Sequence, residues 1–142
     1  MSQGYGPKSG SYARAAGSYG QHGGQGDTAR EVEAKILLRA ARQIQDLHDS
    51  WDGQDTQRIE KTISYNRQVW AVFYDMALEA ANDPSAKGKM SANILSLATF
   101  VFQRSLDILA DPDREKLPVL ITINREIAAG LMERAPAAEI PG

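Results

Sequence analysis

The stretch TAREVEAKILLRAARQIQDLHD, residues 28–49, decides the fold class of this chain. Thr28 and Glu31 stand three residues apart ahead of an apolar series, which is the spacing of a capping box at a helix N-terminus. This pattern predicts an amphipathic helix that ends near Asp49, before the turn SWDGQD. The apolar residues that recur at intervals of three or four are Val32, Ile36, Ala40, Ile44 and Leu47.

Three further segments show the same helical period. No segment alternates apolar and polar residues with a period of two between turn residues, so we predict no sheet. Long helices joined by short connections indicate an all-α fold, a compact bundle of about four helices. We expect the further helices at residues 56–81, from a start between Ser85 and Ser91 to Ala110, and from Leu117 or Pro118 to Glu133.

Residues 1–26 differ from the rest of the chain in composition. They hold eight of the 12 glycines and three tyrosines, and they contain no Val, Ile, Leu, Phe or Trp. Such a stretch buries too little apolar surface to offset the entropy of ordering, so we predict a disordered Gly/Tyr-rich tail. Its tyrosines leave a second interpretation open, weak contacts with a partner. The helical domain is expected at residues 27–134, and residues 135–142 are expected to form a frayed C-terminus.

The composition also limits the chemistry of the 142 residues. The absence of cysteine excludes disulfides and thiolate metal ligands, and it favours the cytoplasm as the location. No apolar run approaches the roughly 18 residues of a membrane span, and the N-terminus lacks the apolar region of a secretory signal. The net charge of −2 gives no general basic field for nucleic acid. No phosphate-binding loop, EF-hand or HExxH pattern is present, so we expect no catalytic residue, cofactor or metal ion.

Two asparagines fall on faces that are otherwise apolar. Asn66 lies between Ile63 and Trp70 in the second expected helix, and Asn124 has a similar position in the fourth. An amide without a partner among aliphatic side chains costs about 1–3 kcal/mol. We therefore predict that Asn66 and Asn124 are polar core residues that bond to each other, or to backbone carbonyls and a water. The alternative is that these amides contact a ligand.

The first expected helix also carries a line of basic residues and a histidine. Lys35, Arg39 and Arg42 form this line, which Asp46 interrupts. A solvated face is the simplest interpretation, and contact with RNA is the alternative. His48 lies in the last turn of the helix, where a cation is favoured, and we interpret it as structural rather than catalytic.

The third expected helix has one aromatic residue away from its apolar face. Phe100 projects about 60° beyond Leu97, beside Arg104 and Asp107, whereas Phe102 lies on the apolar arc. A large aromatic side chain on a polar face either packs against a neighbouring segment or contacts a partner. We predict that Phe100, Arg104 and Asp107 form a partner-binding surface.

Four stretches in a fixed order carry a resemblance to a known family. They are TAREVEAKILLRAA, YNRQVWAVFYDMA, NILSLATFVFQRSLDIL and LITINREIAAGL. The ordered set resembles the FlaF family of bacterial flagellar biosynthesis regulators, from about Tyr12 to Leu131. The chain departs from the family pattern in the glycine-rich lead at residues 16–27 and in the segment AKGKMSAN, which starts the third helix.

The resemblance implies a small cytoplasmic helical protein that flagellin production and filament assembly require. It implies flagellin as a partner, with the FlbT regulator as a further one, and it implies no enzymatic activity. We predict a regulator or secretion chaperone that covers an amphipathic helix of flagellin before assembly. The alternative is a post-transcriptional regulator that contacts flagellin messenger RNA directly, which the net charge disfavours and which a steep dependence of affinity on salt would reveal.

Overall fold

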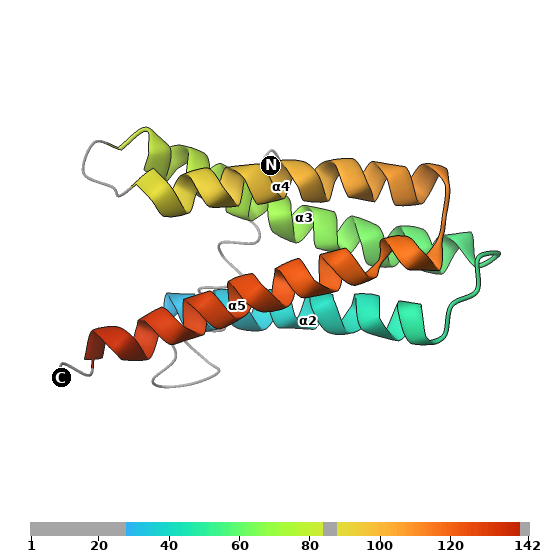
Figure 1. Cartoon of the computed structure of the whole chain (residues 1–142), viewed down its shortest axis with the longest axis horizontal. Coiled ribbons are helices and arrows are strands. Elements are labelled where there is room, and N and C mark those ends of the chain that lie inside the picture. Colours follow the sequence, from blue (N-terminus) through green and yellow to red (C-terminus); the bar gives the residue numbers. More distant parts are fainter. Residues whose placement is uncertain (1–27, 84–87, 140–142) are drawn as a thin grey trace, which may run out of the picture.

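The computed structural model of the chain describes residues 28–83 and 88–139, and it describes side chains over residues 28–83 and 92–133. These residues form helices and no strand, which confirms the predicted all-α fold class. The tail predicted for residues 1–26 lies outside the described residues, as do residues 140–142. In chain order the elements are α2 (Ala29–Asp49), α3 (Thr56–Ala81), α4 (Gly88–Ala110), the 3-10 helix η1 (Arg114–Lys116) and α5 (Pro118–Glu139) (Figure 1).

Side chains near the first turns determine where two of the helices begin. The backbone N–H of Glu31 donates to Thr28 Oγ1 over 3.1 Å, and the N–H of Thr28 donates to Glu31 Oε1 over 2.7 Å. The predicted capping box at the start of α2 is therefore confirmed. Asp55 caps α3, since its carboxylate accepts a hydrogen bond from the N–H of Arg58 over 3.1 Å.

Two segments differ from the sequence-based expectation. The 3-10 helix η1 was not predicted, because three residues are too few to show a hydrophobic period. Asp113 caps this helix by accepting a hydrogen bond from the N–H of Glu115 over 2.9 Å. Helix α5 continues to Glu139, beyond the expected end at Glu133. Its last residues are rich in alanine, which favours helix despite Pro136.

The helices alternate in direction and form two antiparallel pairs (Figure 1). Helix α2 packs along α5, and α3 packs along α4, while α2 and α3 have a smaller contact. In Figure 1 the α3–α4 pair lies above the α2–α5 pair. Each pair presents an apolar face to the other, so the hydrophobic core lies between the two pairs.

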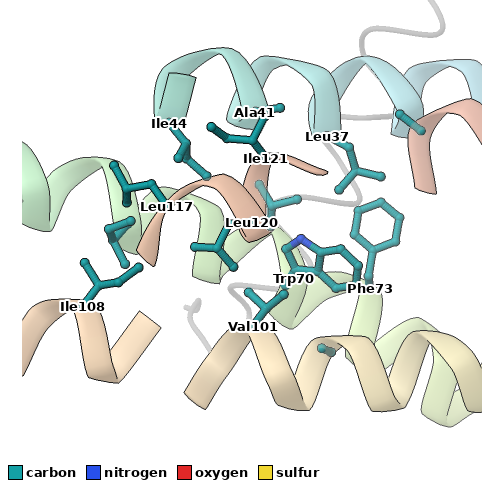
Figure 2. Packing of buried hydrophobic residues seen from close by; sticks show 14 of the residues in the cluster. Leu37, Ala41, Ile44, Trp70, Phe73, Val101, Ile108, Leu117, Leu120 and Ile121 are labelled. Atoms are coloured by element: carbon teal, nitrogen blue, oxygen red, sulfur yellow. The ribbon is translucent and has the colours of Figure 1, made fainter. Parts of the chain in front are cut away.

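Trp70 of α3 occupies the centre of this core and is fully buried. Figure 2 shows its indole among Leu37 of α2, Val101 of α4 and Leu120 of α5. The ring centroid of Phe73 lies 5.9 Å from that of Trp70, with an angle of 47° between the ring planes. Because side chains from all of these helices surround one indole, a change in its volume affects the packing of both pairs.

Candidate partner-binding groove

A hydrogen-bonded pair of amides crosses the core beside Trp70. Asn66 of α3 and Asn124 of α5 are both fully buried. Asn124 Nδ2 donates to Asn66 Oδ1 over 2.7 Å and to the carbonyl of Leu37 over 3.3 Å. Asn124 Oδ1 accepts from Trp70 Nε1 over 2.9 Å. The side chain of Asn124 thus links α2, α3 and α5, which restricts how these helices can slide along one another.

Two arginines hold the end of the bundle at which α2 ends. Arg58 of α3 donates to the carbonyls of Asp46 and Ser50 over 3.2 and 3.3 Å. Arg114 of η1 donates from Nε to the carbonyl of His48 over 3.0 Å. These bonds satisfy carbonyls at the end of α2, where positive charge is also favoured by the helix dipole. This end of the bundle is therefore fastened by contacts between elements.

Phe100, Arg104 and Asp107, the predicted partner-binding residues, lie close together on α4. The guanidinium carbon of Arg104 lies 5.3 Å from the ring centroid of Phe100, which is a cation–π geometry. Arg104 also donates to the carbonyl of Lys116 over 3.4 Å, and Lys116 Nζ donates to Asp107 Oδ1 over 3.2 Å. Both charged groups therefore help to hold η1 against α4. The ring of Phe100 is partly exposed, and its role in partner binding stays a prediction.

The basic line predicted on α2 gathers with a residue from α5. Lys35, Arg39, Arg42 and Arg125 line a surface depression of about 470 Å³. Arg125 Nη2 also donates to Gln45 Oε1 over 3.4 Å. Sequence reasoning did not include Arg125, because it reaches this face only through the packing of α5 along α2.

An apolar groove lies at the opposite end of the bundle, where α2 and α4 begin and α3 ends. The two helix pairs diverge toward this end (Figure 1). The groove has a volume of about 450 Å³, and no sequence motif marks it. Met76 on its wall is 42% exposed. The other apolar residues that line the groove are Ala29, Phe73, Ala77, Ala80, Ile94, Ile127 and Leu131.

Glu33 of α2 places a carboxylate in the lining of this groove. The side chain is half-buried, and it forms no hydrogen bond or ion pair with the residues that the structure describes. Burial raises the pKa of Glu33, and the positive charge of Arg30 opposes this effect only in part. An unpaired carboxylate in partly apolar surroundings is unfavourable for the free chain.

Gly130 of α5 also lines the groove. A Cβ atom added at this position would meet no atom within 4 Å. A glycine inside a helix costs roughly 0.5–1 kcal/mol relative to alanine, so the fold gains nothing in helix stability from this residue. The missing side chain leaves additional space in the groove.

The comparisons with known proteins identify the family of the chain. The family model described as flagellar protein FlaF matches residues 15–131. The chain belongs to the FlaF family. The resemblance seen in the sequence is thus confirmed, and the matched FlaF segment includes every described residue that lines the groove. No curated protein and no solved structure matches the chain.

The described part of this FlaF chain has neither a helix suited to crossing a membrane nor a candidate metal-binding cluster. None of its described helices is long and apolar enough to cross a membrane. Over residues 28–83 and 88–139, the structure brings together no group of three His, Asp or Glu side chains that could hold a metal ion.

Proposed function

We propose that this protein regulates flagellin production and filament assembly in the cytoplasm by binding flagellin, as a secretion chaperone or an export-coupled regulator. Membership of a flagellar protein family supports the biological setting. The apolar groove at the end of the bundle where α2 and α4 begin is the observation that supports binding of a protein segment. A groove with apolar walls and a few charged side chains in its lining suits one face of an amphipathic helix.

The difference between the two ends of the bundle favours the groove over the opposite end as the docking surface for flagellin. The opposite end is held by Arg58 and Arg114, whose donors bond backbone carbonyls of α2 and the following turn. At the groove end, Met76 is substantially exposed, so a partner can cover it without the chain unfolding. Covering apolar surface stabilises a complex by about 25 cal/mol per Å² before the costs of association are subtracted.

Phe100, Arg104 and Asp107 on α4 form a second predicted contact surface for flagellin. The partly exposed ring of Phe100 can serve as an aromatic anchor, with Arg104 held over its face. The FlbT regulator is a further expected partner. We expect no enzymatic activity.

Binding of full-length protein to monomeric flagellin, measured by calorimetry, tests the proposed function. Met76→Glu places a charge in the groove and should weaken flagellin binding by about tenfold or more. Leu106→Glu is the matched control, because Leu106 is 60% exposed on α4 and does not line the groove. Failure of the unaltered protein to bind flagellin would contradict the proposal. An equal loss of flagellin affinity in Met76→Glu and Leu106→Glu would contradict the groove as the docking surface.

Direct contact with flagellin messenger RNA is a second candidate function, favoured by one observation. Lys35, Arg39, Arg42 and Arg125 surround one surface depression. RNA binding there should weaken steeply as salt increases, whereas groove binding should not. Replacing Arg42 and Arg125 by glutamine should abolish RNA binding and leave flagellin binding intact. RNA affinity that does not respond to these changes would exclude this face.

A further inference from the structure

We infer that the groove takes one flagellin helix that carries a lysine or arginine beside its apolar face, with this basic group at Glu33 and the helix packed over Gly130. The inference rests on the proposed function and specifies which kind of flagellin segment binds and how it is oriented. It is based on the composition of the groove walls, on the charged side chains in the groove lining and on the free space beside Gly130 of α5.

The walls indicate that the occupant is helical. The lining contributed by α3 and α4 consists of Phe73, Met76, Ala77, Ala80 and Ile94, which offer no polar side chain to a bound backbone. No sheet edge is present among the described residues, so an extended peptide could not add a strand. A helix satisfies its own backbone N–H and C=O groups, and it can therefore lie against apolar walls without leaving these groups unpaired.

The charged side chains in the groove lining indicate that the bound helix carries a basic residue. Arg30, Glu33 and Glu126 are the charged side chains in its lining, so carboxylates outnumber cations there. Glu33 is half-buried and unpaired among the described residues, and its pKa is raised mainly by burial. A lysine or arginine from a partner would give this carboxylate an ion pair in surroundings that water screens weakly. A bound helix with only acidic or neutral residues near Glu33 would bury this carboxylate more deeply and give it no cation.

Gly130 indicates where the incoming helix comes close. The position has open space where a Cβ would lie, and it faces the groove from α5. The Cβ of a larger side chain there would meet no atom of the free protein within 4 Å, and we expect the rest of that side chain to occupy the volume that the partner needs. Gly130→Leu therefore separates binding from folding, because it should block the groove without destabilising α5.

Calorimetric titration of full-length protein with monomeric flagellin tests the inference. Glu33→Gln and Gly130→Leu should each weaken flagellin binding by about tenfold or more. Two matched controls should bind as the unaltered protein does. Glu60→Gln removes an exposed carboxylate near the start of α3, and Ala129→Leu adds the same side chain to the exposed face of α5. Thermal unfolding of each variant shows that it is folded.

A second titration identifies the basic group on flagellin. Synthetic peptides of the terminal helices of flagellin, with each lysine and arginine replaced in turn by glutamine, are titrated into unaltered protein and into Glu33→Gln. One replacement should weaken binding to the unaltered protein by about tenfold and have little effect on binding to Glu33→Gln. If every replacement has the same effect on both proteins, no flagellin cation pairs with Glu33 and the inference is wrong.

The outcomes distinguish this inference from the proposed function. If flagellin binds and none of the groove variants changes its affinity, the inference is overturned and the proposed function stands. If flagellin does not bind the unaltered protein, both fall. If the unaltered protein dimerises and Gly130→Leu is monomeric with full flagellin affinity, the groove is an interface between two copies of this chain, and the inference is again overturned.

Discussion

Asn124 on α5 donates a hydrogen bond of 2.7 Å from Nδ2 to Oδ1 of Asn66 on α3, inside the apolar core. The two amides are not equivalent. Asn124 also bonds to Trp70 Nε1 and to the carbonyl of Leu37, whereas Asn66 Nδ2 is buried with no partner among the described residues. Removal of the Asn124 amide therefore leaves several groups without a partner, whereas removal of the Asn66 amide takes away only one bond of Asn124.

Because the two amides are bonded differently, replacing each by leucine should lower the free energy of unfolding by a different amount. Asn124→Leu should lower the free energy of unfolding by about 2–4 kcal/mol, because Trp70 Nε1 and Asn66 Oδ1 both lose a partner. Asn66→Leu should cost about 1 kcal/mol or less, because Asn124 keeps its other two bonds and an unpaired donor disappears. Urea denaturation measures both values. Equal costs would show that these hydrogen bonds do not determine the energetics of the core.

Asn66→Asp provides a separate test of burial at the same position. It should destabilise the fold more than Asn66→Leu does at neutral pH, because a carboxylate without a cation would enter the core. Denaturation of the two variants in parallel gives the comparison. Full stability of both would contradict the buried position of Asn66.

The sequence predicted the helices and several of their ends because those signals are local. Thr28 and Glu31 lie within one helical turn, so their spacing alone specifies the capping box. Pro118 begins α5 as expected, since proline is tolerated at a first helical position. The face shared by Phe100, Arg104 and Asp107 also followed from the helical period alone.

Features that depend on distant segments could not be derived from one sequence. The period placed Asn66 and Asn124 on apolar faces, but only the packing of α5 brings Leu37 and Trp70 to the same network. The bond from Arg104 to the carbonyl of Lys116 needs the unpredicted η1. The groove depends on the divergence of two helix pairs, which no local pattern encodes.

Two phenylalanines on α4 should separate partner binding from stability. Phe102 packs against the core and meets Tyr74 edge-on, with ring centroids 5.7 Å apart. Phe102→Ala should therefore lower the free energy of unfolding by about 2–3 kcal/mol. Phe100→Ala should lower it by less than about 1 kcal/mol, because Phe100, unlike Phe102, is not among the side chains packed against the core cluster, while flagellin affinity falls by about tenfold. The reverse order of stabilities would contradict the assignment of the two faces.

Gly130→Ala should stabilise the protein. The added methyl group meets no atom within 4 Å, so the gain in helix propensity is not offset by a clash. We expect about 0.5–1 kcal/mol, which corresponds to an increase in Tm of roughly 2–6 °C for a domain of this size. The reciprocal change Ala129→Gly, on the exposed face of the same helix, should lower Tm by a similar amount. A loss of stability in Gly130→Ala would mean that the space beside α5 is needed by the fold itself.

Glu33→Gln should change how stability depends on pH. Burial raises the pKa of Glu33 above the ordinary value of a glutamate, so the folded chain holds this proton more tightly than the unfolded chain does. The contribution of Glu33 to stability is therefore most favourable below its unfolded-state pKa and declines as the pH rises through its folded-state pKa. Glutamine does not titrate, so the variant should gain stability relative to the unaltered protein over this interval and keep the gain at neutral pH. The two neighbouring charges, Arg30 and Glu126, remain in both proteins.

Urea denaturation at a series of pH values from about 3.5 to 7.5 measures this difference. Glu60→Gln is the control, because Glu60 is exposed and its variant should track the unaltered protein at every pH. A difference between Glu33→Gln and the unaltered protein that does not vary with pH would contradict the raised pKa. At neutral pH without flagellin, Glu33→Gln should be more stable than the unaltered protein. Saturating flagellin should reverse this order, because the bound basic group favours the Glu33 carboxylate. The flagellin complex of the unaltered protein should then be more stable than that of Glu33→Gln.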